Sequence, residues 1–598
     1  MKQQLLCKLV LLISLRPVEL FSPTSSPPSV VIIGGGWAGY GAAEGLARLC
    51  SEGKLNVTVL EAQPRGGGLA ASWLTPGGRR VEAGIHGFWR NYRNIDQLVT
   101  SSLGLTGDAS PFTDFCESTL FTRRGKAVVS PKLDTFPRLP APLGTALLPE
   151  FGTVSIFDRS TAAALALPWL DFDGSDSAWR RYDDTTASSL LAPVSPQLYE
   201  EFLLPMLLVL PMAPGYDISA AAALSCFSFF ALEHQSDFDV RWLKAGATEC
   251  IFEPWRDKLE AQGVVIRDGT RVDKIQIADA GLGGASTADE SLGRAEAVVT
   301  ADGERIACDY LISGVNINAM KKIVEANPAL ATRAEFQKVK KLRAISVVAV
   351  RLWLSKPLSP KPATPSNVCG IGLTTELESI GWTFYHLNDL QDAFMSSSGG
   401  DPKEDCGSSV VECDFYNAIS LMSLSDADIV DVAARALRRA DPSVFGALGD
   451  YPGNEHNSGR HSNGKLFIED FAVVKVREAV SHFSPGSFRS LPKIRSSSLR
   501  NFAFAGDWVD RGGHRSWSQE KALVTGFQAA RIAVEALVGD TMQEKHVDEA
   551  EACLGHGALT RVDIEKVPLP LEVEDDEPHV ALGRSAVRFL RGAFSRRA

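Results

Sequence analysis

Three glycines near the N-terminus have the spacing that brings a polypeptide backbone against a phosphate. Gly34, Gly36 and Gly39 form a Gly-x-Gly-x-x-Gly pattern, in which the first glycine permits a tight turn and the second lets the backbone approach a pyrophosphate. The third allows a helix and a strand to pack closely. Trp37 and Ala38 would begin that helix, whose free N–H groups and dipole favour a bound anion. The spacing therefore predicts a dinucleotide site.

The segments around these glycines add an acid at the expected distance. Residues 30–33 predict a buried strand, an alanine-rich helix follows, and residues 57–60 predict a second strand. Glu61 comes at the carboxyl end of that strand, 22 residues after Gly39. A carboxylate there accepts hydrogen bonds from ribose hydroxyls and repels a 2′-phosphate, which favours FAD or NAD over NADP.

Two further stretches narrow the dinucleotide. Residues 61–68, Glu-Ala-Gln-Pro-Arg-Gly-Gly-Gly, resemble the second glycine motif of the FAD-dependent amine oxidase superfamily. Residues 81–89 contain Gly84-x-His86-x-Phe88 and resemble the form of the next motif found in carotenoid (phytoene and zeta-carotene) desaturases. The resemblance implies FAD as cofactor, and it implies that these segments contact the flavin and the diphosphate. Its contact residues here are Ala62, Arg65, Gly67, Gly68, Leu69, Gly84 and His86. Leu69 stands where the family usually has Arg or Lys.

The C-terminal part of the chain supplies the complementary half of the site. Residues 502–508 predict a strand that ends in Gly506-Asp507, and residues 518–526 open an alanine-rich helix. The resemblance assigns the ribityl chain to Asp507 and the pyrimidine edge of the flavin to the helix start, with Gln519, Glu520 and Ala522. Lys521 replaces the usual glycine. Val272 matches a family strand whose backbone meets the adenine.

The resemblance also implies a fold class and a domain order. We expect an α/β protein: a Rossmann-type FAD-binding domain, similar to that of glutathione reductase, with an interleaved α+β substrate domain. The FAD-binding domain would comprise residues 30–110, 236–320 and 490–540, and the substrate domain residues 111–235 and 321–489. Residues 1–29 would be a targeting presequence and residues 541–598 a tail with a basic amphipathic end.

The presequence has a lysine before an apolar run (residues 5–15) and a hydroxyl-rich stretch after it. This run is too short to span a bilayer but suits a signal-peptide core. The whole segment resembles the two-part presequence of algae with secondary plastids, which predicts a plastid location; the alternatives are the secretory pathway and a disordered or mis-annotated start.

Composition excludes several classes of protein. The 598 residues carry a net charge of −11, so no nucleic-acid partner is expected, because that usually needs a basic face. The ten scattered cysteines form no Cys-x-x-Cys pair, and neither a metal site nor a disulfide framework is indicated. Two apolar stretches, residues 202–212 and 220–232, are each too short to cross a membrane. They would line a tunnel for a long isoprenoid, dip into one leaflet, or form ordinary core helices.

The tail ends in a short segment with two faces. Arg584, Arg588 and Arg591 share one helical face, while apolar residues form another. A basic helix of this kind can make peripheral contact with an anionic membrane; the alternatives are a disordered tail and a helix packed against the body.

The leading functional hypothesis is therefore an FAD-dependent oxidoreductase that desaturates a long polyene or isoprenoid by hydride transfer to flavin N5, with a quinone or oxygen as electron acceptor. The alternatives are a carotenoid isomerase without net redox change, a flavin amine oxidase, and a non-catalytic flavoprotein that binds lipid. No acid–base pair can be read from the sequence. His86, Arg511, His514 and Arg515 are candidate catalytic residues only because their motifs adjoin the flavin elements.

Overall fold

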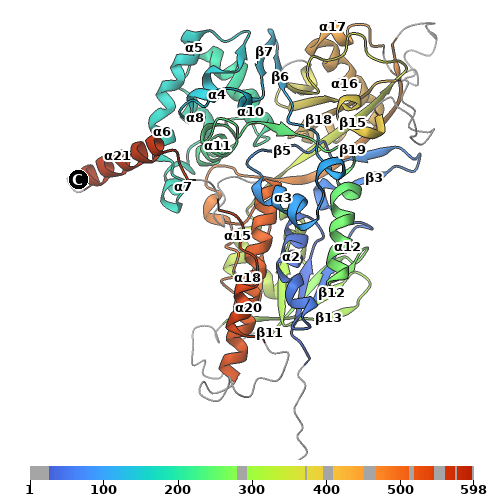
Figure 1. Cartoon of the computed structure of the whole chain (residues 1–598), viewed down its shortest axis with the longest axis vertical. Helices are drawn as coiled ribbons and strands as arrows, with labels where there is room; N and C mark the ends of the chain where they lie inside the picture. Colours follow the sequence, from blue (N-terminus) through green and yellow to red (C-terminus); the bar gives the residue numbers. More distant parts are fainter. Residues whose placement is uncertain are drawn as a thin grey trace, which may run out of the picture.

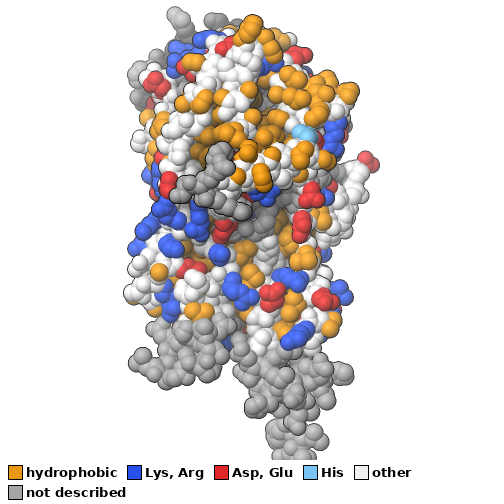
Figure 2. Space-filling model, turned by 90° about the vertical axis from the view of Figure 1, so that its left-hand side faces the viewer, with side chains coloured by type: hydrophobic (Ala, Val, Ile, Leu, Met, Phe, Trp, Pro, Cys, Tyr) orange, Lys and Arg blue, Asp and Glu red, His pale blue; other side chains and the backbone are white. Residues whose placement is uncertain are grey.

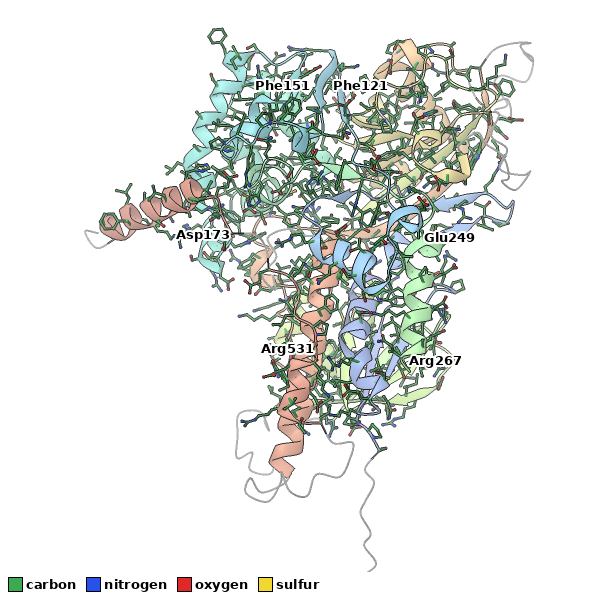
Figure 3. The ribbon with its side chains drawn as sticks, viewed as in Figure 1. Phe121, Phe151, Asp173, Glu249, Arg267 and Arg531 are labelled. Atoms are coloured by element: carbon green, nitrogen blue, oxygen red, sulfur yellow. The ribbon has the colours of Figure 1, made fainter. Side chains whose placement is uncertain are left out.

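The computed structural model describes residues 26–278, 292–370, 374–394, 408–449, 451, 466–510, 518–544, 559–572 and 575–595. Two layered bodies are stacked along the long axis of the molecule (Figure 1). In Figure 3, Arg267 and Arg531 lie in the lower body, whereas Phe121 and Phe151 lie in the upper one. Arg511, His514 and Arg515, predicted as candidate catalytic residues, lie outside the described residues.

The lower body is built on a parallel sheet of five strands in the order β10-β2-β1-β14-β20. Its strands are β1 (Ser29–Ile33), β2 (Asn56–Leu60), β10 (Val265–Arg267), β14 (Tyr310–Ser313) and β20 (Phe502–Phe504). Every pairing in it is parallel. Continuous apolar runs such as Val-Val-Ile-Ile in β1 suit strands that are covered on both faces. The sheet draws its strands from three separated parts of the chain.

Helices cover this sheet. The helices α2 (Trp37–Ser51) and α18 (Gln519–Glu544) pack against each other and on the sheet. Residues Gln519–Gly539 of α18 are long and apolar enough to cross a membrane, but most of them are buried inside the protein, so we interpret α18 as a core helix. Around them lie α3 (Arg93–Gln97), α12 (Glu253–Ala261), α13 (Ile317–Glu325), α14 (Pro328–Ala331), α15 (Ala334–Val339) and the antiparallel strands β11 (Val272–Ala278), β12 (Arg294–Thr300) and β13 (Arg305–Ala307).

The upper body is built on a mixed sheet of eight strands, ordered β19-β15-β18-β17-β16-β6-β7-β8. These are β6 (Ser118–Thr122), β7 (Gly125–Ser130), β8 (Glu150–Phe151), β15 (Arg343–Leu354), β16 (Ser366–Cys369), β17 (Gly381–His386), β18 (Val410–Tyr416) and β19 (Ile468–His482). One face packs on α16 (Asp426–Ala440) and α17 (Pro442–Phe445) in an apolar core. There are two further small antiparallel sheets among the described residues: the hairpin of β3 (Ser72–Leu74) with β4 (Arg80–Glu82), and β5 (Phe88–Trp89) with β9 (Val240–Arg241), strands that are far apart in the chain.

Short helices flank the upper sheet beside β6 to β8 (Figure 1). They are α4 (Leu143–Leu147), α5 (Ile156–Ser160), α6 (Ala166–Asp171), α7 (Asp176–Tyr182), α8 (Ala187–Leu191), α9 (Pro196–Leu198), α10 (Leu204–Val209) and α11 (Ala220–Phe227). The two apolar stretches predicted at residues 202–212 and 220–232 fall largely in α10 and α11 and their extensions.

The C-terminal segment packs against the body. It contains α20 (Arg561–Glu565) and α21 (Pro578–Ser595), and α21 lies on α6 (Figure 1). Arg584 is buried, with its guanidinium 3.2 Å from Asp576 and 3.7 Å from Glu233. Arg591 donates to Asp171 at 2.5 Å.

The arginines of α21 therefore pair with carboxylates of the protein. Arg588 lies 3.8 Å from Asp173, which Figure 3 shows near this helix. This packing agrees with the alternative of a helix packed against the body, and membrane contact by the basic face stays a prediction. Large apolar residues are exposed on α21 together with Arg588 and Arg591, with Leu582, Phe589 and Leu590 exposed by 72%, 75% and 53%.

Candidate active site

One cavity of about 1690 Å³ runs from the carboxyl ends of the parallel sheet into the upper body. Most small-molecule pockets hold roughly 300–1,000 Å³, so this cavity has room for more than one ligand. All predicted cofactor residues except Gly39 and Glu520 line it. The two motif-rich ends of the chain therefore meet at one place.

The first glycine motif forms the turn between β1 and α2. Gly34 has φ +100°, a left-handed conformation that side chains rarely tolerate. A Cβ on Gly39 would lie 1.8 Å from the carbonyl oxygen of Gly34, which explains why this position packs the helix on the turn instead of lining the cavity. A Cβ on Gly36 would lie 3.5 Å from Cα of Gly68, so a side chain there would enter the space between the two glycine motifs.

Glu61 lies at one end of the cavity and is buried. The backbone N–H groups of Gly35 and Gln63 donate to its carboxylate at 2.6 and 2.7 Å. Burial raises the pKa of Glu61, and these two hydrogen bonds oppose the rise. Val272, at the start of β11, lines the same end. This arrangement suits a ribose and an adenine between the acid and the strand.

The second glycine segment crosses beside the first. Arg65 lines the cavity with its guanidinium 4.8 Å from the ring centre of Trp73. The Nε atom of Arg65 is buried and has no hydrogen-bond partner among the described residues. An unpaired buried donor is costly, and a phosphate oxygen would satisfy it. Together with the open glycine backbone, this unpaired donor shows that the site fits a dinucleotide diphosphate.

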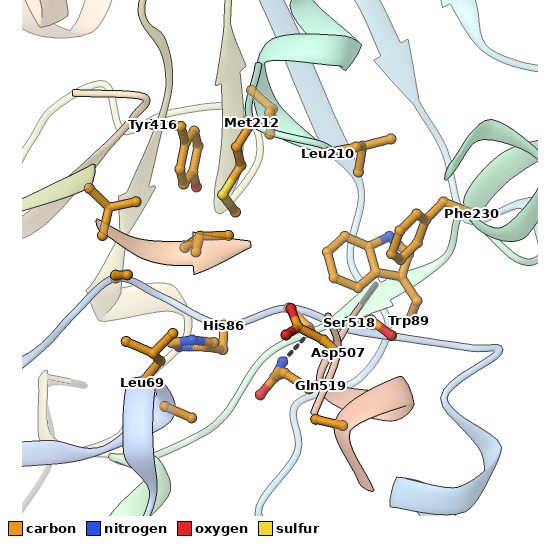
Figure 4. Close-up of a pocket in the computed structure, with 18 of the residues that line it drawn as sticks. Leu69, His86, Trp89, Leu210, Met212, Phe230, Tyr416, Asp507, Ser518 and Gln519 are labelled. Atoms are coloured by element: carbon orange, nitrogen blue, oxygen red, sulfur yellow. Dashed lines mark hydrogen bonds between the residues drawn. The ribbon is translucent and has the colours of Figure 1, made fainter. Parts of the chain in front are cut away.

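The other end of the dinucleotide region is built by three segments. These segments line the cavity with Gly84 and His86, with Gly506 and Asp507, and with Gln519 and Ala522. The indole N–H of Trp37 donates to Oε1 of Gln519 at 2.9 Å, and Ser481 donates to Asp507 at 2.9 Å. In Figure 4, Asp507, Ser518 and Gln519 lie together on one side of the cavity.

His86 faces this space without charge. Burial lowers the pKa of His86 to about 4, so the imidazole is neutral at physiological pH. Its Nδ1 atom has no hydrogen-bond partner among the described residues. His86 can therefore exchange a hydrogen bond with a bound flavin, and its low pKa makes it a weak base.

Two residues near the start of α18 point elsewhere. The carboxylate of Glu520 accepts hydrogen bonds of 2.7 and 2.9 Å from the backbone N–H groups of Asn94 and Ile95 at the start of α3. Its side chain thus holds α3 against α18 and does not line the cavity. Lys521 is buried and also does not line it, so the lysine that replaces the family glycine leaves the flavin space open.

Beyond the flavin end the cavity becomes apolar. Leu69 and Met212 both pack against a small cluster of Val347, Tyr416 and Ala479. Figure 4 shows Tyr416 and Met212 opposite Leu69 and His86, with Leu210, Trp89 and Phe230 farther along. Both predicted apolar stretches contribute to the wall, through Phe202, Leu203, Met206, Val209, Leu210, Met212, Phe227, Phe230, Ala231 and Leu232.

The structure also places a buried carboxyl group in this wall that we did not predict. Asp414 lines the cavity from β18, and Glu412 lies two residues earlier on the same face. The signal was present in residues 410–416, Val-Val-Glu-Cys-Asp-Phe-Tyr, where two acids alternate within an otherwise apolar strand. Buried acids of this kind are rare unless they are paired or functional.

Comparison with known proteins agrees with this geometry. The sequence model of the family described as "flavin containing amine oxidoreductase" matches residues 47–534. A 15-cis-phytoene desaturase, chloroplastic/chromoplastic, from Solanum lycopersicum is 23% identical over 542 residues, which span 88% of this chain and 82% of that protein. A carotenoid phi-ring synthase from Streptomyces griseus is 27% identical over 344 residues, spanning 56% of this chain and 62% of that protein.

Among solved structures, a double mutant of putrescine oxidase superposes with a TM-score of 0.55 at 14% identity, covering 85% of this chain and 99% of that one. At this identity the likeness concerns the fold alone. It confirms the predicted α/β fold class.

Proposed function

The chain belongs to the flavin-containing amine oxidoreductase family, and from this premise we propose that it oxidises a long apolar polyene, a carotenoid-like isoprenoid, in the cavity described above. Family membership confirms the predicted FAD cofactor and the predicted oxidoreductase activity. The identity of the substrate is the proposal.

The observation that carries the proposal is the continuity of the cavity. Its dinucleotide end has the glycine motifs, Glu61 and Asp507, and the remainder is walled mainly by Leu, Phe, Met and Ala. Apart from Asp414, this mainly apolar wall offers a polar substrate little to replace its hydration, whereas a hydrocarbon chain would gain from burial. The relatives named phytoene desaturase and carotenoid phi-ring synthase support a carotenoid-like molecule.

The residues of the chain have separable tasks in this reaction. Bound FAD would supply the two-electron oxidation. Gly36, Gly68 and Arg65 would hold the diphosphate, Glu61 the ribose and Asp507 the ribityl chain. The apolar wall would hold the polyene in line and exclude water. We propose a quinone or oxygen as the acceptor that restores oxidised FAD.

The position of the cavity mouth indicates how such a substrate would enter. Five residues that line the cavity are also exposed at the surface: Leu143, Ala146, Ala162, Ala163 and Ala166. The cavity thus has an opening between α4 and α6, which we call the mouth; it is also open at the dinucleotide end, where Gln63 and Arg271 are exposed. Large apolar side chains are exposed on the surface in these segments: Leu147 51%, Ile156 55%, Phe157 81% and Leu167 64%.

This apolar surface, which we call the mouth patch, consists of Leu143, Leu147, Ile156, Phe157 and Leu167 with Leu582, Phe589 and Leu590 of α21. Figure 2 shows hydrophobic side chains gathered over the upper half of this face. Monomeric proteins rarely expose such patches without a partner. We propose that the mouth patch dips into one leaflet of a membrane, so that a polyene passes from lipid into the cavity without crossing water.

A substitution at the mouth tests the substrate. Ala163→Trp should obstruct the entrance while leaving the distant dinucleotide end intact, and Ala164→Trp is the matched control because Ala164 is exposed but does not line the cavity. We expect Ala163→Trp to retain FAD with a normal flavin spectrum and to lose the isoprenoid that mass spectrometry detects in lipid extracts of the purified wild-type protein. If both variants carry the same lipids as the wild type, or if none carries an isoprenoid, the tunnel proposal is wrong.

We also propose a plastid location. It rests on the signal-like and hydroxyl-rich residues 1–29 and on the chloroplastic relative. A fluorescent protein fused to residues 1–29 should enter plastids in an alga with secondary plastids. Entry into the secretory pathway alone would contradict this location.

A further inference from the structure

The strand β18 carries a row of polar side chains on the face opposite its apolar core. Val411, Cys413 and Phe415 pack into the core beside α16, and the alternation of a strand directs Glu412, Asp414 and Tyr416 to the other face. Glu412 is 1% exposed and Asp414 2% exposed. Asp414 and Tyr416 line the cavity. A carboxyl group therefore faces the space in which the proposed substrate would lie.

Asp414 is held directly against the desaturase-like motif. The backbone N–H of Ile85 donates to its Oδ2 atom at 2.7 Å. Gly84, with φ +133°, leaves the room for this contact, because a Cβ there would lie 3.2 Å from Oδ2. The Oδ1 atom is buried and has no hydrogen-bond partner among the described residues. One oxygen of the carboxyl is thus fixed by the motif, and the other is an unpaired buried acceptor in the cavity wall.

The charges around Asp414 do not balance. Arg351 is a buried cation that donates to Glu412, lies 3.6 Å from Glu82 and donates to the carbonyl oxygen of Arg80 at 2.8 Å. One guanidinium thus stands among three buried carboxyl groups. Burial raises the pKa of Asp414 well above its ordinary value, and the charge of Glu412 raises it further. Burial also raises the pKa of Glu82 to about 7. The cluster therefore retains a proton under conditions in which a surface acid would have lost it.

We propose that Asp414 is a catalytic base that accepts the proton leaving the substrate when the new double bond forms. This inference rests on the proposed oxidation of a polyene. Bound FAD would take up the hydride from one C–H bond of the substrate, and the carboxylate of Asp414 would take up the proton from the neighbouring C–H bond. The electron pair of that second bond becomes the new π bond. After the product leaves, the carboxyl returns its proton to water.

Base strength distinguishes Asp414 from its neighbours in the cavity. His86, with a pKa of about 4, is too weak a base to hold a proton taken from carbon. Burial raises the pKa of Tyr385 and of Tyr416, so both remain neutral phenols. Glu412 and Glu82 do not line the cavity. Asp414 alone among these groups combines access with a strongly basic conjugate form.

The reaction should depend on pH through this group, because only the ionised form can accept a proton. The titratable and charged groups packed around Asp414 are Glu412 and Tyr416 on its own strand, Arg351 on β15, Tyr385 on β17, Glu82 on β4 and His86 after β4. The rate should therefore rise with pH through the raised pKa of Asp414, well above the range of an ordinary carboxyl.

The test uses the FAD-loaded full-length protein without oxygen. Flavin bleaching by phytoene or zeta-carotene is followed in stopped flow between pH 6 and 10, and the carboxyl band of the same protein is titrated by infrared spectroscopy. We expect Asp414→Asn to slow bleaching by about a hundredfold or more, to remove the rise with pH, and to remove one protonated-carboxyl band. In the wild type, the rate and the band should share one midpoint.

Two companion variants sharpen the result. Glu82→Gln removes a neighbouring negative charge and should shift the midpoint to lower pH without abolishing the pH dependence. Glu376→Gln, at a surface acid paired with Arg435 in the same body, should behave as the wild type. If polyenes bleach the wild type and Asp414→Asn equally, the role of Asp414 is wrong and the proposed function stands. If no polyene bleaches the wild type, the proposed function fails and this role fails with it.

Discussion

The backbone N–H of Gly35 donates a 2.6 Å hydrogen bond to Oε2 of Glu61, which ties the glycine turn after β1 to the acid after β2. The same carboxylate accepts from Gln63 at 2.7 Å. Glu61 thus holds the glycine turn in the conformation that the dinucleotide would contact. Single substitutions at this end of the cavity should therefore affect dinucleotide binding.

Gly36→Val should abolish retention of FAD. A Cβ at this position would point between the two glycine motifs, 3.5 Å from Cα of Gly68, and the valine methyl groups would fill the diphosphate space. Flavin absorbance of the purified protein measures the effect. Gly77→Ala, at a glycine outside the cavity lining, should keep a full complement of flavin; a yellow, fully loaded Gly36→Val protein would contradict the assignment.

Glu61→Ala should weaken FAD binding without preventing folding. The charge-assisted hydrogen bonds that it removes are worth about 1.5–3 kcal/mol, which corresponds to a rise in Kd of roughly 10- to 150-fold. Titration of the apoprotein with FAD, followed by quenching of flavin fluorescence, gives the value. An unchanged Kd would show that the acid does not contact the ribose.

Phe157→Ser combined with Phe589→Ser should weaken binding to anionic phospholipid vesicles. The two rings are 81% and 75% exposed, and each buries apolar surface worth about 1.5–3 kcal/mol when it enters lipid. Vesicle pelleting should fall by about tenfold or more, equally at low and high salt, because the arginines of α21 pair with the protein's own carboxylates. Leu74→Ser, 57% exposed on the β3–β4 hairpin, is the control; pelleting that depends on salt but not on the two rings would refute the mouth patch.

His86 should make stability depend on pH in a defined window. The folded-state pKa of about 4 lies below the ordinary value of 6.5, so the unfolded chain binds more protons between these pH values. Stability is complete above pH 6.5 and falls by up to about 3 kcal/mol as the pH drops to 4. Urea unfolding of His86→Gln should lack this part of the decline. Identical pH dependence in the two proteins would show that His86 is not held in its neutral form.

The glycine motifs could be predicted because their constraints are local. Gly34, Gly36 and Glu61 belong to one strand–helix–strand unit, and their spacing alone specifies how a backbone approaches a diphosphate. The convergence of Asp507 on the same cavity needed the family resemblance in addition, because nothing in the spacing joins the two ends of the chain.

The carboxyl cluster and the orientation of α21 could not be predicted. Glu82, Arg351 and Asp414 are brought together only when β15 and β18 pair beneath the β4 segment, and no local pattern encodes that pairing. The spacing of Arg584, Arg588 and Arg591 indicated that these residues share one face of a helix. It did not indicate whether that face would be exposed to solvent or would contact Asp171 and Glu233. Burial of charge by distant partners is a property of the folded chain.

The most direct test of the account is the anaerobic spectrum of the FAD-loaded protein after addition of a possible substrate. We predict that phytoene or zeta-carotene bleaches the oxidised flavin, that the product is lighter than the substrate by one hydride and one proton, and that a quinone restores the colour, whereas primary amines and polyamines leave the spectrum unchanged. Bleaching by amines but not by carotenes would contradict the account in favour of an amine oxidase. Conversion of a carotene only by pre-reduced protein, to a product of unchanged mass, would contradict it in favour of an isomerase.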